Sequence, residues 1–216
     1  MNKERIFNYL DELITNPVCE LDFNKDYELL IAVMLSAQTT DKRVNLVTKV
    51  LFNKYPTLEE LSIANLEDVK IIIKSLGTYS KKASNVIIIA NRLLTESNGK
   101  VPRNRDFLES LPGVGRKTTN VVLGILYNVP CIAVDTHVAR VAVRLGFAKA
   151  GDSVYTIEQK LTKKIPKDNM IRIHHQLLLF GRYYCKAMKP ECQNCKIYDI
   201  CKEKRKSIWF PFFINL

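Results

Sequence analysis

A lysine and an aspartate that lie 18 positions apart are the residues of this chain best suited to covalent chemistry. Lys117 sits just inside an expected helix, and Asp135 directly precedes a run of helically spaced apolar residues that begins at Val138. An amine nucleophile and a carboxylate that each begin a helix form a plausible imine-forming pair. Asp135 is also expected to be the N-cap of its helix.

The lysine follows a tight turn between two expected helices. Pro112 ends the first helix, because proline lacks an amide hydrogen and biases its predecessor away from the helical region. Gly113 and Gly115 are expected to provide positive φ and close backbone approach. The amides of Gly113, Val114, Gly115 and Arg116 would then face outward as an anion site. In a basic protein the expected anion is a nucleic-acid phosphate, although many glycine turns simply connect helices.

Four cysteines near the C-terminus have the spacing of a metal centre. They are Cys185, Cys192, Cys195 and Cys201, in the pattern C-x6-C-x2-C-x5-C. In a chain expected to be intracellular, four thiolates in one short loop indicate a tetrahedral sulfur site rather than disulfides. Zinc and a cubane iron–sulfur cluster both suit such a donor set, and the spacing alone leaves the metal undecided.

Two lysines, Lys186 and Lys189, lie between the first two of these cysteines. A loop that is held by a metal and carries lysines is a rigid platform for backbone phosphates. This interpretation gives the metal an architectural and electrostatic role rather than a redox one. His174 and His175 are adjacent rather than four residues apart, so we expect them to be structural.

The composition favours a helical protein that binds an anionic partner. The chain has 216 residues, is 47% hydrophobic and carries a net charge of +11, with a pI near 9.4. Apolar residues recur at helical spacing and strand-like alternation is rare, which predicts an all-α fold. The N-terminus lacks the pattern of a secretory signal, and the apolar runs are too short to span a bilayer. We therefore expect a cytoplasmic protein with no membrane partner.

Two polar segments interrupt the helical pattern. The nearly wholly apolar segment 27–37 is typical of a buried helix, and it ends at Gln38, a polar residue with no evident capping role. Thr40 or Asp41 is expected to cap the helix that follows. Ser80 is expected to cap a later helix, with Lys81 and Lys82 in its first turn facing either solvent or a phosphate.

Taken together, four motifs resemble the endonuclease III family of helix-hairpin-helix DNA glycosylases. They are LPGVGRKT at 111–118, VDTHV at 134–138, LSAQTTD at 35–41 and the four-cysteine pattern. They occur in matching order over roughly residues 4–202.

The resemblance implies an all-α fold of two helical domains that flank a DNA-binding cleft. Residues 19–130 would form a six-helix barrel with the hairpin, and residues 1–18 and 131–216 an iron–sulfur domain. By this analogy the four cysteines hold a [4Fe–4S] cluster rather than zinc. The expected partner is double-stranded DNA that contains oxidised pyrimidines or abasic sites. The protein is expected to bind it as a monomer and to be associated with the nucleoid.

The resemblance also assigns roles to single residues. Lys117 matches the Schiff-base lysine, Asp135 the catalytic aspartate, and Gln38 the glutamine that fills the gap left by an extruded nucleotide. The family is bifunctional: it removes the base and then cuts the strand by β-elimination. One departure is Thr78, which follows Gly77 where the family commonly has a bulky aliphatic wedge.

Three other hypotheses are weaker. An adenine-mismatch glycosylase would have a glutamate where this chain has Ala32, and it would lack Lys117. A non-catalytic module that only grips DNA phosphates is argued against by the pairing of Lys117 with Asp135. A membrane-surface role would rest on net charge and on the aromatic segment 208–213 alone. That segment could pack on the domain, bind a partner or be disordered.

Overall fold

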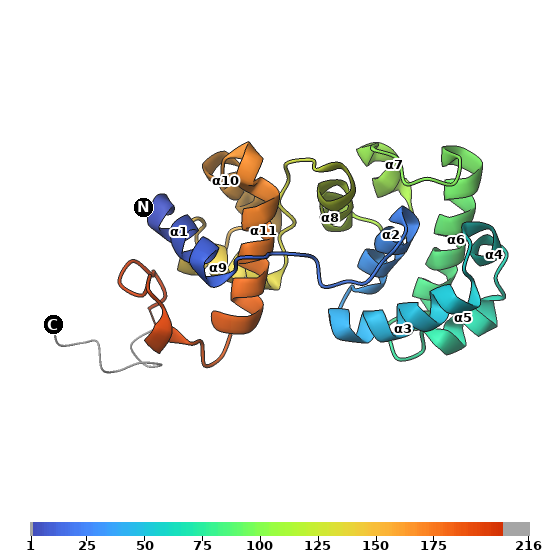
Figure 1. Ribbon diagram of the computed structural model, residues 1–216, viewed down its shortest axis with the longest axis horizontal. Helices are drawn as coiled ribbons and strands as arrows, with labels where there is room; N and C mark the ends of the chain where they lie inside the picture. The colour runs from blue at the N-terminus through green and yellow to red at the C-terminus, as the bar shows by residue number, and fades with distance from the viewer. Residues whose placement is uncertain (1, 205–216) are drawn as a thin grey trace. The chain divides into compact units, whose positions relative to one another are not determined.

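The structure is a computed structural model that describes residues 2–204, and these residues are helical without a single strand (Figure 1). The predicted all-α fold is therefore confirmed. No helix among the described residues is long and apolar enough to cross a membrane. The aromatic segment 208–213 lies outside the described residues.

The chain divides into two compact units. One unit runs from Glu20 to Asn128, and the other joins the residues up to Cys19 to the segment from Val129 onward. The chain thus leaves one unit, builds the other without interruption and then returns to the first.

The continuous unit contains seven helices among its residues. They are α2 (Asp26–Leu35), α3 (Asp41–Lys54), α4 (Leu58–Ser62), α5 (Leu66–Ile72), α6 (Tyr79–Ser97), α7 (Arg105–Ser110) and α8 (Arg116–Tyr127). Nine of the ten residues of α2 are buried, because this helix packs against α3, α6 and α8. The prediction of a buried, nearly all-apolar helix here is confirmed.

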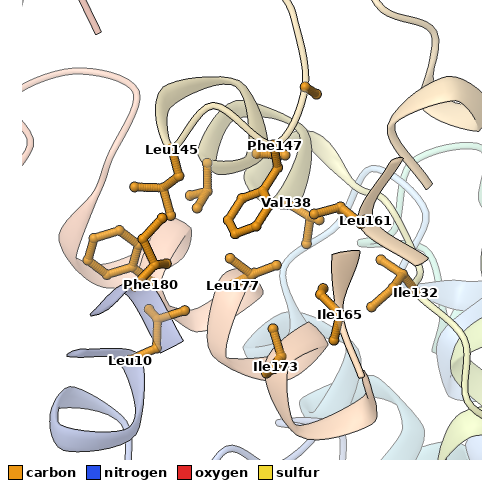
Figure 2. Packing of buried hydrophobic residues seen from close by; sticks show 14 of the residues in the cluster. Leu10, Ile132, Val138, Leu145, Phe147, Leu161, Ile165, Ile173, Leu177 and Phe180 are labelled. Atoms are coloured by element: carbon orange, nitrogen blue, oxygen red, sulfur yellow. The ribbon is translucent and has the colours of Figure 1, made fainter. Parts of the chain in front are cut away.

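The discontinuous unit is built around α11. Its elements are α1 (Lys3–Leu13), α9 (Thr136–Arg144), α10 (Val154–Lys164), the 3-10 turn η1 (Lys167–Asn169), α11 (Met170–Leu179), the π-helix η2 (Phe180–Tyr184) and the 3-10 turn η3 (Cys192–Asn194). Helix α1 packs on α11 although about 160 residues separate them (Figure 1). Figure 2 shows the shared core, in which Leu10 of α1 lies with Val138, Leu161 and Leu177 from the other helices.

Side-chain caps fix several helix starts. Asp135 accepts a hydrogen bond from the Val138 amide at 2.8 Å, and Thr40 accepts one from the Arg43 amide at 3.4 Å, so both predicted caps are confirmed. Ser80 is not a cap: α6 begins at Tyr79, one residue earlier. The N-cap position is occupied by Thr78, whose hydroxyl donates to the Gly77 carbonyl instead of accepting from the helix.

Helix α11 ends in a wider turn that leads to the first cysteine of the cluster motif. Residues Phe180–Tyr184 form a single π-helical segment, a feature that is frequent at functional sites. Helix α9 packs so closely here that a Cβ on Gly181 would lie 3.0 Å from the carbonyl oxygen of His137. Glycine suits this contact, because a Cβ would require its neighbours on α9 to shift by a few tenths of an ångström.

Candidate functional site

The hairpin turn between α7 and α8 depends on one glycine in the left-handed conformation. Gly113 has φ +78°, and a Cβ there would lie 2.6 Å from Asn85 Nδ2 and 3.2 Å from Met34 Cγ. Both the backbone angle and the close packing therefore require glycine at this position. The amide of Val114 then closes the turn by donating to the Leu111 carbonyl at 3.1 Å.

Gly115 differs from the prediction. Its φ is −107° and its ψ is −176°, which is extended backbone, and no atom lies within 4 Å of a Cβ built on it. The fold itself therefore does not demand glycine here, and the open space is on the outer side of the turn. Val114 also differs from the prediction of an outward-facing amide. Its side chain is buried, and its amide already donates to the Leu111 carbonyl.

The first turn of α8 is electropositive. It begins at Arg116 and lacks an acidic residue, and the N-cap residue Gly115 has no side chain with which to cap it. Both Arg116 and Lys117 are exposed. The helix dipole and the two side chains therefore give this helix start a positive potential. Such a site would stabilise a backbone phosphate and bring an amine close to a bound substrate.

Gln38 lies at an exposed turn between α2 and α3. Its backbone is left-handed, with φ +58°, which is uncommon for a residue other than glycine and is often found at functional positions. The turn is closed by the Thr39 amide, which donates to the Ser36 carbonyl at 3.0 Å. The side chain of Gln38 is thus presented to solvent and does not serve as a cap.

The structure contradicts both alternatives considered for Lys82, contact with solvent and contact with a phosphate. The residue is 5% exposed, so it faces neither solvent nor a phosphate. Its Nζ donates to the carbonyls of Leu35 at 2.9 Å and Ala37 at 2.8 Å, at the end of α2. The sequence did contain a signal, because Lys82, Val86 and Ile89 share one stripe of α6, on which a lysine is out of place.

Asp135 is half-buried at the start of α9. Its Oδ1 atom accepts the hydrogen bond that caps the helix. A carboxylate has a second oxygen and several lone pairs, so the capping role leaves acceptor capacity for chemistry. Asp135 lies in the same unit as the four cysteines. Lys117 and Gln38 lie in the continuous unit.

The four cysteines of the motif line one cavity of about 280 Å³. Aromatic side chains complete its wall, contributed by Tyr9, Phe180, Tyr184 and Tyr198. Within residues 2–204, no three His, Cys, Asp or Glu side chains lie close enough together to hold one metal ion. His174 and His175 are buried, as predicted for structural residues.

Burial makes this cavity a poor environment for bare thiolates. It raises the pKa of Cys195 to about 11 and raises the pKa of Cys185 and Cys192. Two polar side chains oppose the effect: Tyr9 hydrogen-bonds Cys195, and Arg144 Nη1 lies 3.3 Å from Cys185 Sγ. Burial thus disfavours the thiolate forms, and Tyr9 and Arg144 partly offset this effect.

Arg144 also fixes the backbone of the cysteine loop, a role that the sequence analysis missed. Its guanidinium is 4% exposed and donates to the carbonyls of Cys185 at 3.2 Å, Lys186 at 2.7 Å and Ala187 at 3.2 Å. Arg140, one turn earlier on α9, donates to the Cys185 carbonyl at 3.1 Å. The signal was again a basic residue on the apolar stripe of a helix.

The two loop lysines differ in their surroundings. Lys186 pairs with Glu191 at 3.3 Å, and both side chains are nearly half exposed, so its charge is partly neutralised. Lys189 is exposed on left-handed backbone with φ +49°. Lys189 is therefore the better placed of the two to meet a phosphate.

The sequence and the fold both match known proteins. The profile of the HhH-GPD superfamily of base excision DNA repair proteins matches residues 31–167 of this chain, which places the chain in that superfamily. It is 45% identical to endonuclease III of Bacillus subtilis (strain 168), over 91% of this chain and 90% of that protein. It is 46% identical to endonuclease III of Escherichia coli (strain K12), over 95% and 99% of the two chains.

A solved structure extends the match to three dimensions. It is that of a trapped endonuclease III–DNA covalent intermediate, with a TM-score of 0.89, 46% identity and coverage of 96% of this chain and 99% of the other. The chain therefore belongs to the endonuclease III family, and the predicted family resemblance is confirmed.

Alanine should destabilise the protein at one hairpin glycine and have little effect at the other. Gly113→Ala should lower the free energy of unfolding by about 1–2 kcal/mol for left-handed backbone alone, and by more because of the contact with Asn85. Gly115→Ala, the matched control, should change it by no more than about 0.5 kcal/mol. Urea unfolding of both variants measures the difference, and equal losses would contradict the assignment.

Removing a lysine from the cysteine loop should change the salt dependence of binding to duplex DNA. Lys189→Ala should weaken binding to undamaged duplex and reduce the slope of log K against log salt by about one. Lys186→Ala should reduce it less, because Glu191 already offsets that charge. Fluorescence anisotropy across a salt series measures both slopes. Equal slopes for wild type and Lys189→Ala would remove this lysine from the interface.

Proposed function

We propose that this protein excises oxidised pyrimidines from double-stranded DNA and cleaves the resulting abasic site, with Lys117 as the nucleophile. The observation that carries this proposal is an exposed lysine in the first turn of α8, at an electropositive helix start directly after the hairpin. Phosphate binding by the hairpin would hold the backbone of a nucleotide beside that amine. The target nucleotide must be extruded from the duplex, because its sugar carbon is not accessible while the base is stacked.

The proposed reaction proceeds through a covalent imine. The Lys117 amine attacks C1′ of the extruded nucleotide, and the electron pair of the glycosidic bond leaves with the base, which takes up a proton. Opening of the sugar ring gives a protonated imine that acidifies the C2′ hydrogens. Loss of one such proton expels the 3′ phosphate by β-elimination, and water then releases Lys117.

Asp135 is proposed to support these steps electrostatically. Its carboxylate would stabilise the positive charge that develops on the sugar as the base leaves, and it would assist deprotonation of the attacking amine. The hydrogen bond that caps α9 fixes the orientation of this carboxylate. Its structural and chemical roles are therefore compatible.

The remaining site residues are proposed to hold the DNA. Gln38 would occupy the gap that the extruded nucleotide leaves, and the backbone of Gly113, Gly115 and Arg116 would bind phosphate. Lys189 would add a contact from the discontinuous unit, which from Val129 onward carries 16 basic and seven acidic residues. A DNA substrate of this kind assigns the protein to the nucleoid.

The cysteine cavity is proposed to hold a [4Fe–4S] cluster, with Cys185, Cys192, Cys195 and Cys201 as ligands. All four thiols line one cavity of about 280 Å³, which offers the Cys₄ donor set that such a cluster needs, and membership of the endonuclease III family favours the cluster over zinc. When bound, the cluster supplies a rigid cross-link for a loop with little regular structure. The loop then presents Lys189 at a fixed position.

Replacing the nucleophile should abolish covalent chemistry while leaving binding intact. Borohydride trapping on a duplex that contains one thymine glycol should give an adduct with the wild type and none with Lys117→Ala. Lys100→Ala, which removes an exposed lysine from another part of the same unit, is the matched control and should be trapped normally.

The outcomes separate the competing functions. An adduct with Lys117→Ala would move the nucleophile to another residue. Tight binding without any adduct from the wild type would indicate a glycosylase without lyase activity or a protein that only binds DNA. An assay of base release then distinguishes those two.

Loss of one ligand should remove the cluster. Cys195→Ser is expected to lose the visible colour and bound iron of the wild type, or to fail to fold. Cys131→Ser, at a cysteine outside the cavity, should retain both. Metal analysis and absorbance measure the effect, and a colourless wild type with one zinc ion per chain would refute the cluster assignment.

A further inference from the structure

The turn that carries Gln38 is supported partly by its own residues. The Thr39 amide donates to the Ser36 carbonyl at 3.0 Å, and the Thr39 hydroxyl lies 3.5 Å from the Ala37 carbonyl. Two needs remain. Gln38 has left-handed backbone without being a glycine, which costs free energy unless the surrounding structure over-determines it. The turn also follows the C-terminus of α2, where the last carbonyls need donors from outside the helix.

Lys82 of α6 meets both needs. Its ammonium bonds the carbonyl of Leu35, the last residue of α2, and the carbonyl of Ala37, the residue directly before Gln38. The positive charge also lies at the negative end of the α2 dipole. Two carbonyls that precede Gln38 are therefore bonded to one atom, which restricts the backbone that leads into Gln38.

A buried amine is an expensive way to satisfy two carbonyls. Burial lowers the pKa of Lys82, and no carboxylate compensates for it, because both bonded partners are neutral carbonyls. An apolar residue of similar length would fill the same space, but it would leave both carbonyls without this donor. The two hydrogen bonds that Lys82 makes point to a role in placing the turn.

The same face of α6 also contacts the hairpin. Asn85 lies one turn after Lys82, and its side chain packs against Gly113. Met34 of α2 packs against Gly113 from another side. Lys82 and Asn85 therefore place two separate loops on one rigid helix, the turn of Gln38 and the hairpin that precedes Lys117.

We propose that Lys82 is a positioning residue that acts through Gln38, holding its turn in register with the hairpin. The inference rests on the proposed role of Gln38 in occupying the vacated position in the duplex. Lys82 does not touch the substrate; it sets the backbone from which Gln38 projects. Displacement of that side chain by about 1 Å is enough to cost a large factor in rate.

A double-mutant cycle tests whether Lys82 acts through Gln38. The variants are Lys82→Met, Gln38→Ala and the double variant, assayed by single-turnover base excision on duplex DNA with one thymine glycol. Each single variant should slow excision by about tenfold, and the double variant should be no slower than Gln38→Ala alone. Lys82→Arg, which keeps donors at the same place, should recover part of the rate. Lys100→Met is the matched control for loss of a lysine.

Hydrogen exchange gives a readout that does not depend on activity. In Lys82→Met the Thr39 amide, which closes the turn, should exchange faster, while the Val114 amide of the hairpin keeps its wild-type rate. If Lys82→Met does not fold, Lys82→Gln replaces it in both experiments.

The outcomes distinguish this inference from the function on which it rests. An additive double variant, or unchanged exchange at Thr39, would overturn the positioning role of Lys82 and leave the role of Gln38 standing. A wild-type rate for Gln38→Ala would overturn both.

Discussion

Backbone carbonyls in an irregular segment have no partners within a helix, and both candidate functional loops of this protein obtain hydrogen-bond donors for them from a neighbouring helix. In each unit the donor is a buried cation on a neighbouring helix. Lys82 bonds the carbonyls of Leu35 and Ala37 in the continuous unit. Arg144 bonds three successive carbonyls from Cys185 onward in the other unit. The two loops are rigid because each is tied to a helix, not because of their own sequences.

The two cations suit the segments that they hold. A lysine ammonium is a point charge with rotatable donors, which fits two carbonyls that lie close together before Gln38. An arginine guanidinium is a planar fork, and it spans a row of carbonyls together with a cysteine sulfur. An exchange of one residue type for the other would therefore preserve only part of the hydrogen bonding in either loop.

Both helix starts that carry the proposed chemistry are also set by local physics. Helix α9 begins at the Asp135 cap, so the reactive carboxylate is oriented by a hydrogen bond to its own helix. Helix α8 begins at Gly115 without a side-chain cap and with two cations in its first turn, which would be unfavourable in isolation. A bound DNA phosphate would relieve this strain, so the unfavourable local sequence is explained by function.

The sequence by itself determined the helical class, the caps at Asp135 and Thr40, the buried character of α2 and the family of the protein. These features depend on local spacing, on capping chemistry and on short motifs, all of which can be read within a few residues. The need for glycine at Gly113 was predictable for the same reason, since a tight turn requires left-handed backbone.

Tertiary structure alone decided which basic residues were buried and what they bonded. Lys82 was expected to face solvent or a phosphate, yet its partners are 45 and 47 residues away. Arg144 likewise bonds carbonyls more than 40 residues away. A basic residue on an apolar helix stripe indicates that the residue is buried, but the stripe does not say which distant carbonyls it bonds. Only the folded chain shows that Gly115 needs no positive φ, whereas Gly113 does.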